Sequence, residues 1–326
     1  MRASRSSFAS ACCSGLLVLG LGAGCSRAPD GASPAPSVST SSSTSTVTTT
    51  DAETPPADPY LTAAPVRSKS IGHTSYVLKL TLEGGAVAAF KPRSKLPLGD
   101  HRYKGEIAAY RLATALGLDN VPRAIPRSFE ASQLRALQGD FDEKALVDGD
   151  GRIRGALVPW IAGYRVLPLE STKERARWEP WLFDMHSIIP DDERELAASI
   201  STMIAFDYVT ANWDRWSGGN VAEDGNDGKV LFVDNDGAFY EWPAPTTLAH
   251  QRALLERVTR FSRRFVNALR ALDDGKLRAA LGEETPGVAL VSDRVVDGVG
   301  ARRAAVVDIV DARIRDHGEA ATLAFD

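Results

Sequence analysis

The sequence has few cysteines, and their positions exclude a fold held together by disulfides. Its three cysteines, Cys12, Cys13 and Cys25, all lie within the first 25 residues of the 326-residue chain. Small exported domains that depend on disulfides carry cysteines throughout the folded part. The chain also lacks a surplus of basic residues, because 38 Lys and Arg are balanced by 42 Asp and Glu. We therefore do not expect a nucleic-acid-binding surface, which needs a concentrated basic face.

The apolar run near the N-terminus is too short to be a comfortable membrane span. It covers residues 15–21 and follows Arg2 and Arg5, a pattern typical of a secretory signal. The segment ends in Leu-Gly-Ala-Gly-Cys at residues 21–25. This ending resembles the lipobox of bacterial lipoproteins, in which small residues fit the signal peptidase and the cysteine receives the lipid.

We therefore predict that residues 1–25 are a lipoprotein-type signal peptide with Cys25 as the lipidation site. The lipobox leucine lies one place early, so a plain secretory signal or an uncleaved anchor stays open. Ser26, rather than Asp, follows the cysteine, and the resemblance then implies anchoring in a bacterial outer membrane, facing the periplasm or the outside. Residues 26–59 are rich in Ser, Thr and Pro and predict a disordered tether, because they cannot bury enough apolar surface to fold.

The folded part begins with the pattern of a β-hairpin. Residues 76–82 alternate like a half-buried strand, Glu-Gly-Gly at 83–85 indicates a turn, and residues 86–92 return as a second strand. Lys91 lies near the end of that strand, where it is either an ordinary surface lysine or one that binds phosphate. The turn around Gly72 offers backbone N–H groups suited to an anion, although an ordinary loop explains it equally well.

A phosphate-binding lysine needs a carboxylate partner, and Glu106 is a candidate. Glu106 stands near the start of a helical pattern over residues 105–117, which places it in the first turn. The helix dipole alone also favours a carboxylate there. Both explanations stay open, but a strand lysine followed by a helix glutamate favours an ion pair with Lys91.

The stretch at residues 206–240 carries the strongest chemical signal. A helical pattern over residues 195–210 leads into an Asn-Trp-Asp-Arg loop, a glycine-rich turn and a buried strand at residues 230–233. Oxygen-bearing side chains gather around that loop: Asp207, Asn212, Asp214, Asn220, Asp234 and Asp236. Phosphoryl transfer needs one carboxylate to orient the attacking hydroxyl and hard oxygen ligands to hold a metal against ATP. The alternatives are a solvated surface loop and a structural, calcium-stabilised turn.

The remaining patterns complete an α+β fold. Residues 155–161 have the pattern of another strand, whereas residues 250–272 and 301–317 each show the amphipathic period of a helix. We predict a small β-rich lobe with one helix at residues 60–160 and a mainly helical lobe at residues 161–326.

Three motifs, in this order, resemble the atypical protein-kinase-like superfamily. They are Phe-Lys-Pro at 90–92 followed by Gly-Glu-Ile-Ala-Ala-Tyr at 105–110, then the Asn-Trp-Asp-Arg loop within 207–215, then Val-Asp-Asn-Asp-Gly at 233–237. The likeness is nearest to the secretory-pathway kinases of the Golgi casein kinase and four-jointed group. Phosphoinositide kinases and HipA-type kinases are more distant. The resemblance implies a two-lobed kinase-like fold.

The resemblance also implies a role for each matching residue. Lys91 would bind the ATP phosphates, and Glu106 would pair with it or help to hold metal. Asp214 would be the catalytic carboxylate that orients or deprotonates the acceptor hydroxyl. Asp234 would ligate Mg²⁺ or Mn²⁺, and Asn212 would brace the loop.

The chain departs from the family pattern at several points. Trp216 stands where many relatives have His, and the paired cysteines of the eukaryotic secretory relatives are absent. The metal-binding Asn usually follows the catalytic Asp by five residues, whereas Asn220 follows Asp214 by six. The pair Gly218-Gly219 can absorb that extra residue. Asn220 is therefore the expected second metal ligand, with Asp236 as the alternative.

Together these observations predict an exported, membrane-anchored, ATP-dependent phosphotransferase that acts on a protein hydroxyl. Compartments outside the cytoplasm are poor in ATP, so nucleotidyl transfer from the same site stays open. An inactive pseudokinase-type binding lipoprotein is a further alternative. Intact Lys91, Glu106, Asp214 and Asp234 speak against it, because a degenerate site usually loses one of these groups.

Overall fold

The structure is a computed structural model that describes residues 58–72 and 75–326. The expected signal peptide, its lipidation site Cys25 and nearly all of the expected tether lie outside these residues. Within the two described ranges, no helix is both long enough and apolar enough to cross a membrane. The described residues all belong to one compact unit.

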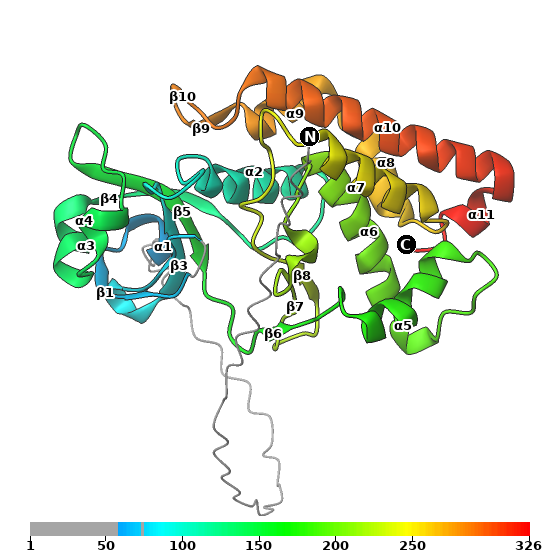
Figure 1. The fold of residues 1–326 in the computed structure, drawn as a ribbon, viewed down its shortest axis with the longest axis horizontal. Helices are drawn as coiled ribbons and strands as arrows, with labels where there is room; N and C mark the ends of the chain where they lie inside the picture. Colours follow the sequence, from blue (N-terminus) through cyan, green and yellow to red (C-terminus); the bar gives the residue numbers. More distant parts are fainter. Residues whose placement is uncertain (1–57, 73–74) are drawn as a thin grey trace, which may run out of the picture. The chain divides into compact units, whose positions relative to one another are not determined.

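A five-stranded antiparallel sheet forms the smaller lobe (Figure 1). Its strand order is β1-β2-β3-β5-β4, with β1 at Pro65–Ser70, β2 at Leu78–Leu82, β3 at Val87–Pro92, β4 at Ile125–Glu130 and β5 at Arg152–Pro159. Alternation along β2 and β3 buries side chains such as Leu80 and Phe90 on one face. The short helices α3 (Ala131–Leu137) and α4 (Phe141–Lys144) contribute Leu134 and Phe141 to the same cluster. The expected hairpin is confirmed.

Helix α2 (Arg102–Ala115) connects the sheet to the helical lobe. It contacts β3 and β5 on one side and α9 (Asp274–Leu281) on the other. The helix starts three residues earlier than the sequence pattern indicated, so the placement of Glu106 in the first turn was wrong. The helix dipole acts mainly on the first turn, and it no longer explains this glutamate.

The larger lobe is mainly helical. Its helices are α5 (Thr172–Phe183), α6 (Arg194–Thr210), α7 (Pro245–Arg257), α8 (Arg263–Ala271), α9, α10 (Asp293–His317) and α11 (Glu319–Thr322). A three-stranded sheet of β6 (Arg165–Val166), β7 (Val221–Glu223) and β8 (Val230–Phe232) accompanies them, as does the hairpin β9 (Glu283–Thr285) and β10 (Val288–Ala289). The one-turn helix α1 (Pro59–Thr62) precedes the first strand. The expected helix before the Asn-Trp-Asp-Arg loop and the expected strand after it are confirmed as α6 and β8.

The single helix expected over residues 250–272 was wrong, because the chain breaks into α7 and α8. The Thr259 N–H donates to the Leu182 carbonyl at 2.8 Å, and the Phe261 N–H donates to the Thr322 carbonyl at 2.7 Å. Ser262 then caps the new helix by accepting the Phe265 N–H at 3.2 Å. Hydrogen bonds to distant segments therefore interrupt a pattern that is amphipathic throughout.

Candidate active site

Lys91, Glu106 and Asp234 come together from three separate elements. Lys91 lies near the end of β3, Glu106 on α2 and Asp234 in the turn after β8. The Lys91 Nζ is 2.5 Å from Glu106 Oε1 and 2.5 Å from Asp234 Oδ1. It is 3.7 Å from Asp236 Oδ2. The structure thus places Lys91 between Glu106, its expected partner, and Asp234, the expected metal ligand.

The charged groups of this cluster stabilise one another's ionised forms. Burial lowers the pKa of Lys91, but the nearby Asp234, Glu106 and Asp236 carboxylates outweigh that effect and raise it overall. Burial raises the pKa of Asp234, but the positive charges of Lys91 and, to a smaller extent, Arg215 and Arg102 outweigh that effect, so the pKa is lowered overall. Burial raises the pKa of Asp236 to about 6, against the attraction of Lys91. At neutral pH the Lys91 ammonium therefore faces the Asp234 carboxylate in its ionised form, which is the form that can bind a metal ion.

The Asp-Asn-Asp-Gly turn packs directly on α2. The Asn235 N–H donates to Glu106 Oε1 at 2.9 Å, so Glu106 binds both the lysine and the turn. A Cβ on Gly105 would lie 2.7 Å from the Asn235 carbonyl oxygen, and this close approach requires glycine. Asp234 has a φ of 54°, a conformation that residues other than glycine adopt infrequently. The surrounding contacts hold it there.

The loop that carries Asp214 begins where α6 ends. Asn212 Oδ1 accepts the Asp214 N–H at 3.1 Å, and Asn220 Nδ2 donates to the Asp214 carbonyl at 2.8 Å. Asn212 thus braces the loop, as the resemblance implied. Burial raises the pKa of the Asp214 carboxyl, and the negative charge of Asp234 raises it further. The two carboxylates are therefore close enough to interact across the site.

The glycine pair accommodates the extra residue before Asn220. Gly218 and Gly219 have φ values of 98° and 84°, which glycine adopts without strain. Asn220 is buried and uses its Nδ2 on the Asp214 carbonyl and on Ser217 Oγ. In the described part of the chain nothing donates a hydrogen bond to its Oδ1. That oxygen is suited to a hard metal ion.

Arg215 is a buried residue whose central position the sequence reasoning missed. Its side chain is 0% exposed and contacts both carboxylate oxygens of Asp207, Nε lying 3.2 Å from Oδ1 and 3.0 Å from Oδ2. It also donates to the carbonyls of Asn220 and Val233 at 2.6 and 2.5 Å and to Asn235 Oδ1 at 2.6 Å. Arg215 thus links the loop to Asp207, to the strand and to the turn.

Trp216, which stands in the place of the family's usual His, has a packing role. Its ring stacks on Trp178 of α5 with centroids 5.8 Å apart.

Gly72 lies in a tight turn, because a Cβ there would be 2.0 Å from the Ser75 carbonyl oxygen. Its neighbours at 73–74 are outside the described residues, so phosphate binding at Gly72 stays a prediction.

The fit of these residues to a divalent metal differs between the two aspartates of the turn. No group of three His, Cys, Asp or Glu side chains in the described ranges is already arranged as a metal site. Asp234 is 38% exposed and can reach a bound ion. Asp236 is 2% exposed, and its Oδ1 is 2.9 Å from Arg102 Nη1. Asp234 and the Asn220 oxygen therefore fit a metal better than Asp236 does.

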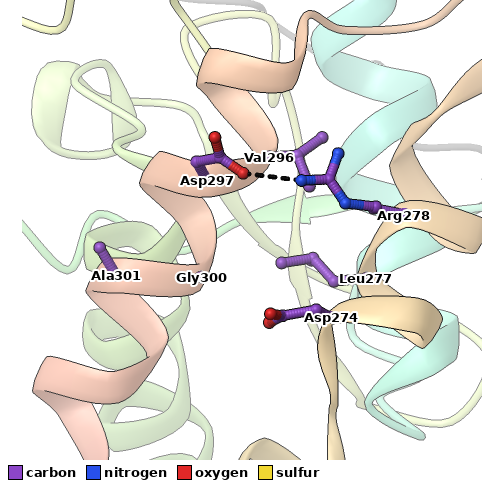
Figure 2. A pocket seen from close by; sticks show the side chains of 7 residues that line it. All are labelled: Asp274, Leu277, Arg278, Val296, Asp297, Gly300 and Ala301. Atoms are coloured by element: carbon purple, nitrogen blue, oxygen red, sulfur yellow. Dashed lines mark hydrogen bonds and ion pairs between the residues drawn. The ribbon is translucent and has the colours of Figure 1, made fainter.

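A separate pocket lies away from these residues, between α9 and α10 (Figure 2). It has a volume of about 260 Å³ and is lined by Leu277, Val296 and the ion pair of Arg278 with Asp297, at 3.0 Å. None of the residues around Lys91 or Asp214 lines it. Its arginine is already paired with Asp297, which leaves the Asp274 carboxylate as the remaining charged group, so the pocket lacks the several converging polar groups expected of an active site.

Gly237 offers a test of how closely the loop and the turn must pack. A Cβ at Gly237 would lie 2.8 Å from Asp214 Cβ and 2.9 Å from Asn212 Oδ1. If the loop has the role in phosphoryl transfer that the three motifs imply, Gly237→Ala should displace Asp214 and lower the turnover of ATP by about 10²-fold, since a displacement near 1 Å can cost that much. Phosphate release from ATP would measure it. Gly139→Ala is the control, because its Cβ meets nothing within 4 Å; equal rates for the two variants would contradict the expectation.

Comparison with known proteins identifies the fold. No protein-family model matches the chain, and no curated protein matches it in sequence. The Golgi casein kinase matches with a TM-score of 0.58 and 14% identity, over 79% of this chain and 75% of that one. Its structure with Mn and ADP bound matches at 0.60 and 14%, over 81% and 76%. Hydra Fam20 with sugar matches at 0.58 and 17%, over 81% and 89%.

At identities of 14–17% such matches establish the fold and leave the chemistry to the residues. They cover about four fifths of this chain. The resemblance inferred from the three motifs is therefore confirmed at the level of fold: the chain has the atypical kinase-like fold of the Golgi casein kinase and Fam20.

Proposed function

We propose that this chain is an ATP-dependent phosphotransferase that uses Mg²⁺ or Mn²⁺ and phosphorylates a protein hydroxyl. The observation that carries the proposal is the joining of Lys91 to both Glu106 and Asp234, each at 2.5 Å, beside Asp214. A kinase-like structure that binds Mn and ADP supports the choice of cofactors. A degenerate binding protein would have no reason to keep this set of charges assembled.

Each residue has a distinct task in this proposal. Lys91, fixed by Glu106, would bind phosphate oxygens of ATP, and backbone N–H groups of the turn around Gly72 would add to that binding. Asp234 and the Asn220 oxygen would hold the metal ion. When bound, the ion would neutralise charge on the phosphates.

Asp214 would act on the acceptor. The acceptor hydroxyl oxygen forms a bond to the γ-phosphorus, and the bond from that phosphorus to the β,γ-bridging oxygen breaks, so that ADP leaves. The hydroxyl proton passes to the Asp214 carboxylate. Catalysis would then consist mostly of positioning and charge neutralisation, with no covalent intermediate on the protein.

The N-terminal segment adds a location to the proposal. Cys25 would carry a lipid and residues 26–59 would tether the kinase-like domain to a membrane outside the cytoplasm. Labelling the protein with a radioactive fatty acid in a bacterial host should mark the wild type and leave Cys25→Ser unlabelled. Equal labelling of both would contradict the lipid anchor and leave the kinase-like site unaffected.

Thermal unfolding of the full-length protein tests the site. With Mn²⁺ or Mg²⁺ and ATP at about 100 times the dissociation constant, binding to the native state should add roughly 2.7 kcal/mol of stability. The rise in melting temperature should need metal and nucleotide together and should disappear in Asp234→Ala. Stabilisation by calcium alone, with none from nucleotide, would instead indicate a structural acidic turn.

A further inference from the structure

Helix α2 contacts the turn after β8 through a second set of side chains, one helical turn before Glu106. Arg102 and Glu106 are four residues apart and lie on the same face of α2. Arg102 Nη1 is 2.9 Å from Asp236 Oδ1, and the two side chains are 15% and 2% exposed. Next to Arg102, His101 Nε2 is 3.0 Å from the Ala238 carbonyl oxygen. The N-terminal part of α2 thus binds the turn through Arg102 and Glu106, and the preceding residue His101 adds a third contact.

Asp236 lies between two cations. One oxygen pairs with Arg102, and the other is 3.7 Å from Lys91 Nζ. That second oxygen is buried and receives no hydrogen bond from the residues that the structure describes. Asp236 therefore links Arg102 to the Lys91 cluster from the interior, and Asp234 is left as the turn's more accessible carboxylate.

Asp234 needs such support because of its backbone. A non-glycine residue at a φ of 54° has a sparsely populated backbone conformation, which it keeps only when its surroundings enforce it. The following residues are held at two points on α2: Asn235 by Glu106 and Asp236 by Arg102. The Glu106 contact belongs to the site already described. The Arg102 contact has no role in it so far.

The positive charge of Arg102 also reaches the rest of the site. Burial raises the pKa of Asp214 and of Asp236, and Arg102 opposes the rise at both carboxyls. The charge of Arg102 thus favours the ionised form of both carboxyls.

We propose that Arg102 is a positioning residue for metal binding, which holds Asp236 and thereby fixes Asp234 with its carboxylate toward the metal of the nucleotide. This inference builds on the proposed function. In this proposal Asp236 does not bind the metal but holds Asp234 in place from the buried side of the turn. Asn220 supplies the second metal ligand. Residues that orient metal ligands typically contribute 10–100-fold to metal affinity or activity.

The test is a titration of full-length protein with Mn²⁺ at fixed, saturating ADP, followed by thermal unfolding. Arg102→Gln should raise the Mn²⁺ concentration needed for half-maximal stabilisation by about 10–100-fold. Arg102→Lys, which keeps the charge, should recover part of that loss. Lys104→Gln is the matched control, because it removes the same charge from the same helix at a side chain that contacts the Ala289 carbonyl at 3.0 Å. It should leave the Mn²⁺ dependence unchanged.

Two outcomes would overturn the inference while leaving the proposed function intact. One is an Arg102→Gln variant that melts earlier without ligand but has the wild-type Mn²⁺ dependence, which would mean that Arg102 only stabilises the fold. The other is a result in which Arg102→Gln and Asp236→Asn affect the Mn²⁺ dependence independently of each other. If Arg102 acts through Asp236, Arg102→Gln/Asp236→Asn should be no worse than Asp236→Asn alone, whereas fully additive losses from the two single variants would show separate roles. If wild-type protein shows no stabilisation by Mn²⁺ and ADP, the proposed function itself fails.

Discussion

Asp214→Asn should lower the rate of phosphoryl transfer by about 10²–10⁴-fold, the usual contribution of a positioned acid or base. The substitution keeps the size of the side chain and removes the proton acceptor. The loop should keep its shape, because Asp214 is tied to Asn212 and Asn220 through its backbone N–H and carbonyl groups. Stabilisation by Mn²⁺ and ADP should therefore persist. Phosphate release from ATP and incorporation of phosphate into the protein itself would measure the rate.

Asp227→Asn is a suitable control for this variant, because Asp227 lies in an exposed turn between β7 and β8. It should retain the wild-type rate. In the wild type, the rate of phosphoryl transfer should fall as the pH is lowered and Asp214 takes up a proton. Since burial raises the pKa of Asp214, this loss should begin at a higher pH than for an ordinary aspartate. A wild-type rate in Asp214→Asn would remove Asp214 from the mechanism.

Arg215→Met should destabilise the fold by about 3–5 kcal/mol, the usual cost of removing one partner of a buried ion pair. Asp207 would remain as a buried carboxylate without its cation, and the carbonyls of Asn220 and Val233 would lose their donor. In the native protein burial raises the pKa of Asp207, and Arg215 opposes the rise. The variant should therefore melt lower by roughly 10 °C.

Arg165→Met is the matched comparison. Arg165 also pairs with a carboxylate, that of Glu223, but the arginine side chain is 65% exposed, and exposed pairs contribute about 0–1 kcal/mol. Its melting temperature should stay close to that of the wild type. Similar losses in both variants would show that burial of Arg215 is not what makes it important. A large loss in Arg215→Met alone would identify this arginine as the link between loop, strand and turn.

The sequence predicted Lys91, Glu106 and the central stretch because their signals are local. Alternating side chains placed Lys91 on a strand, and the helical period placed Glu106 on the following helix. The start of α2 could not be predicted as well, since Arg102 and Tyr103 join the helix through contacts with Asp236 and Glu284, far along the chain. The break between α7 and α8 was missed for the same reason: its backbone bonds go to Leu182 and Thr322.

The sequence by itself determined the hairpin whose second strand carries Lys91, the helix that carries Glu106, and the acidic loop with its glycine pair. Periodicity and turn chemistry depend on neighbouring residues, so one chain suffices to read them. Only the tertiary structure decided which charges pair. Arg102 meets Asp236 across 134 residues, and Lys91 meets Asp234 across 143. Many arginines and aspartates satisfy the same local pattern, and only packing of α2 against the turn selects these partners, because a buried charge must find its counterion within the fold.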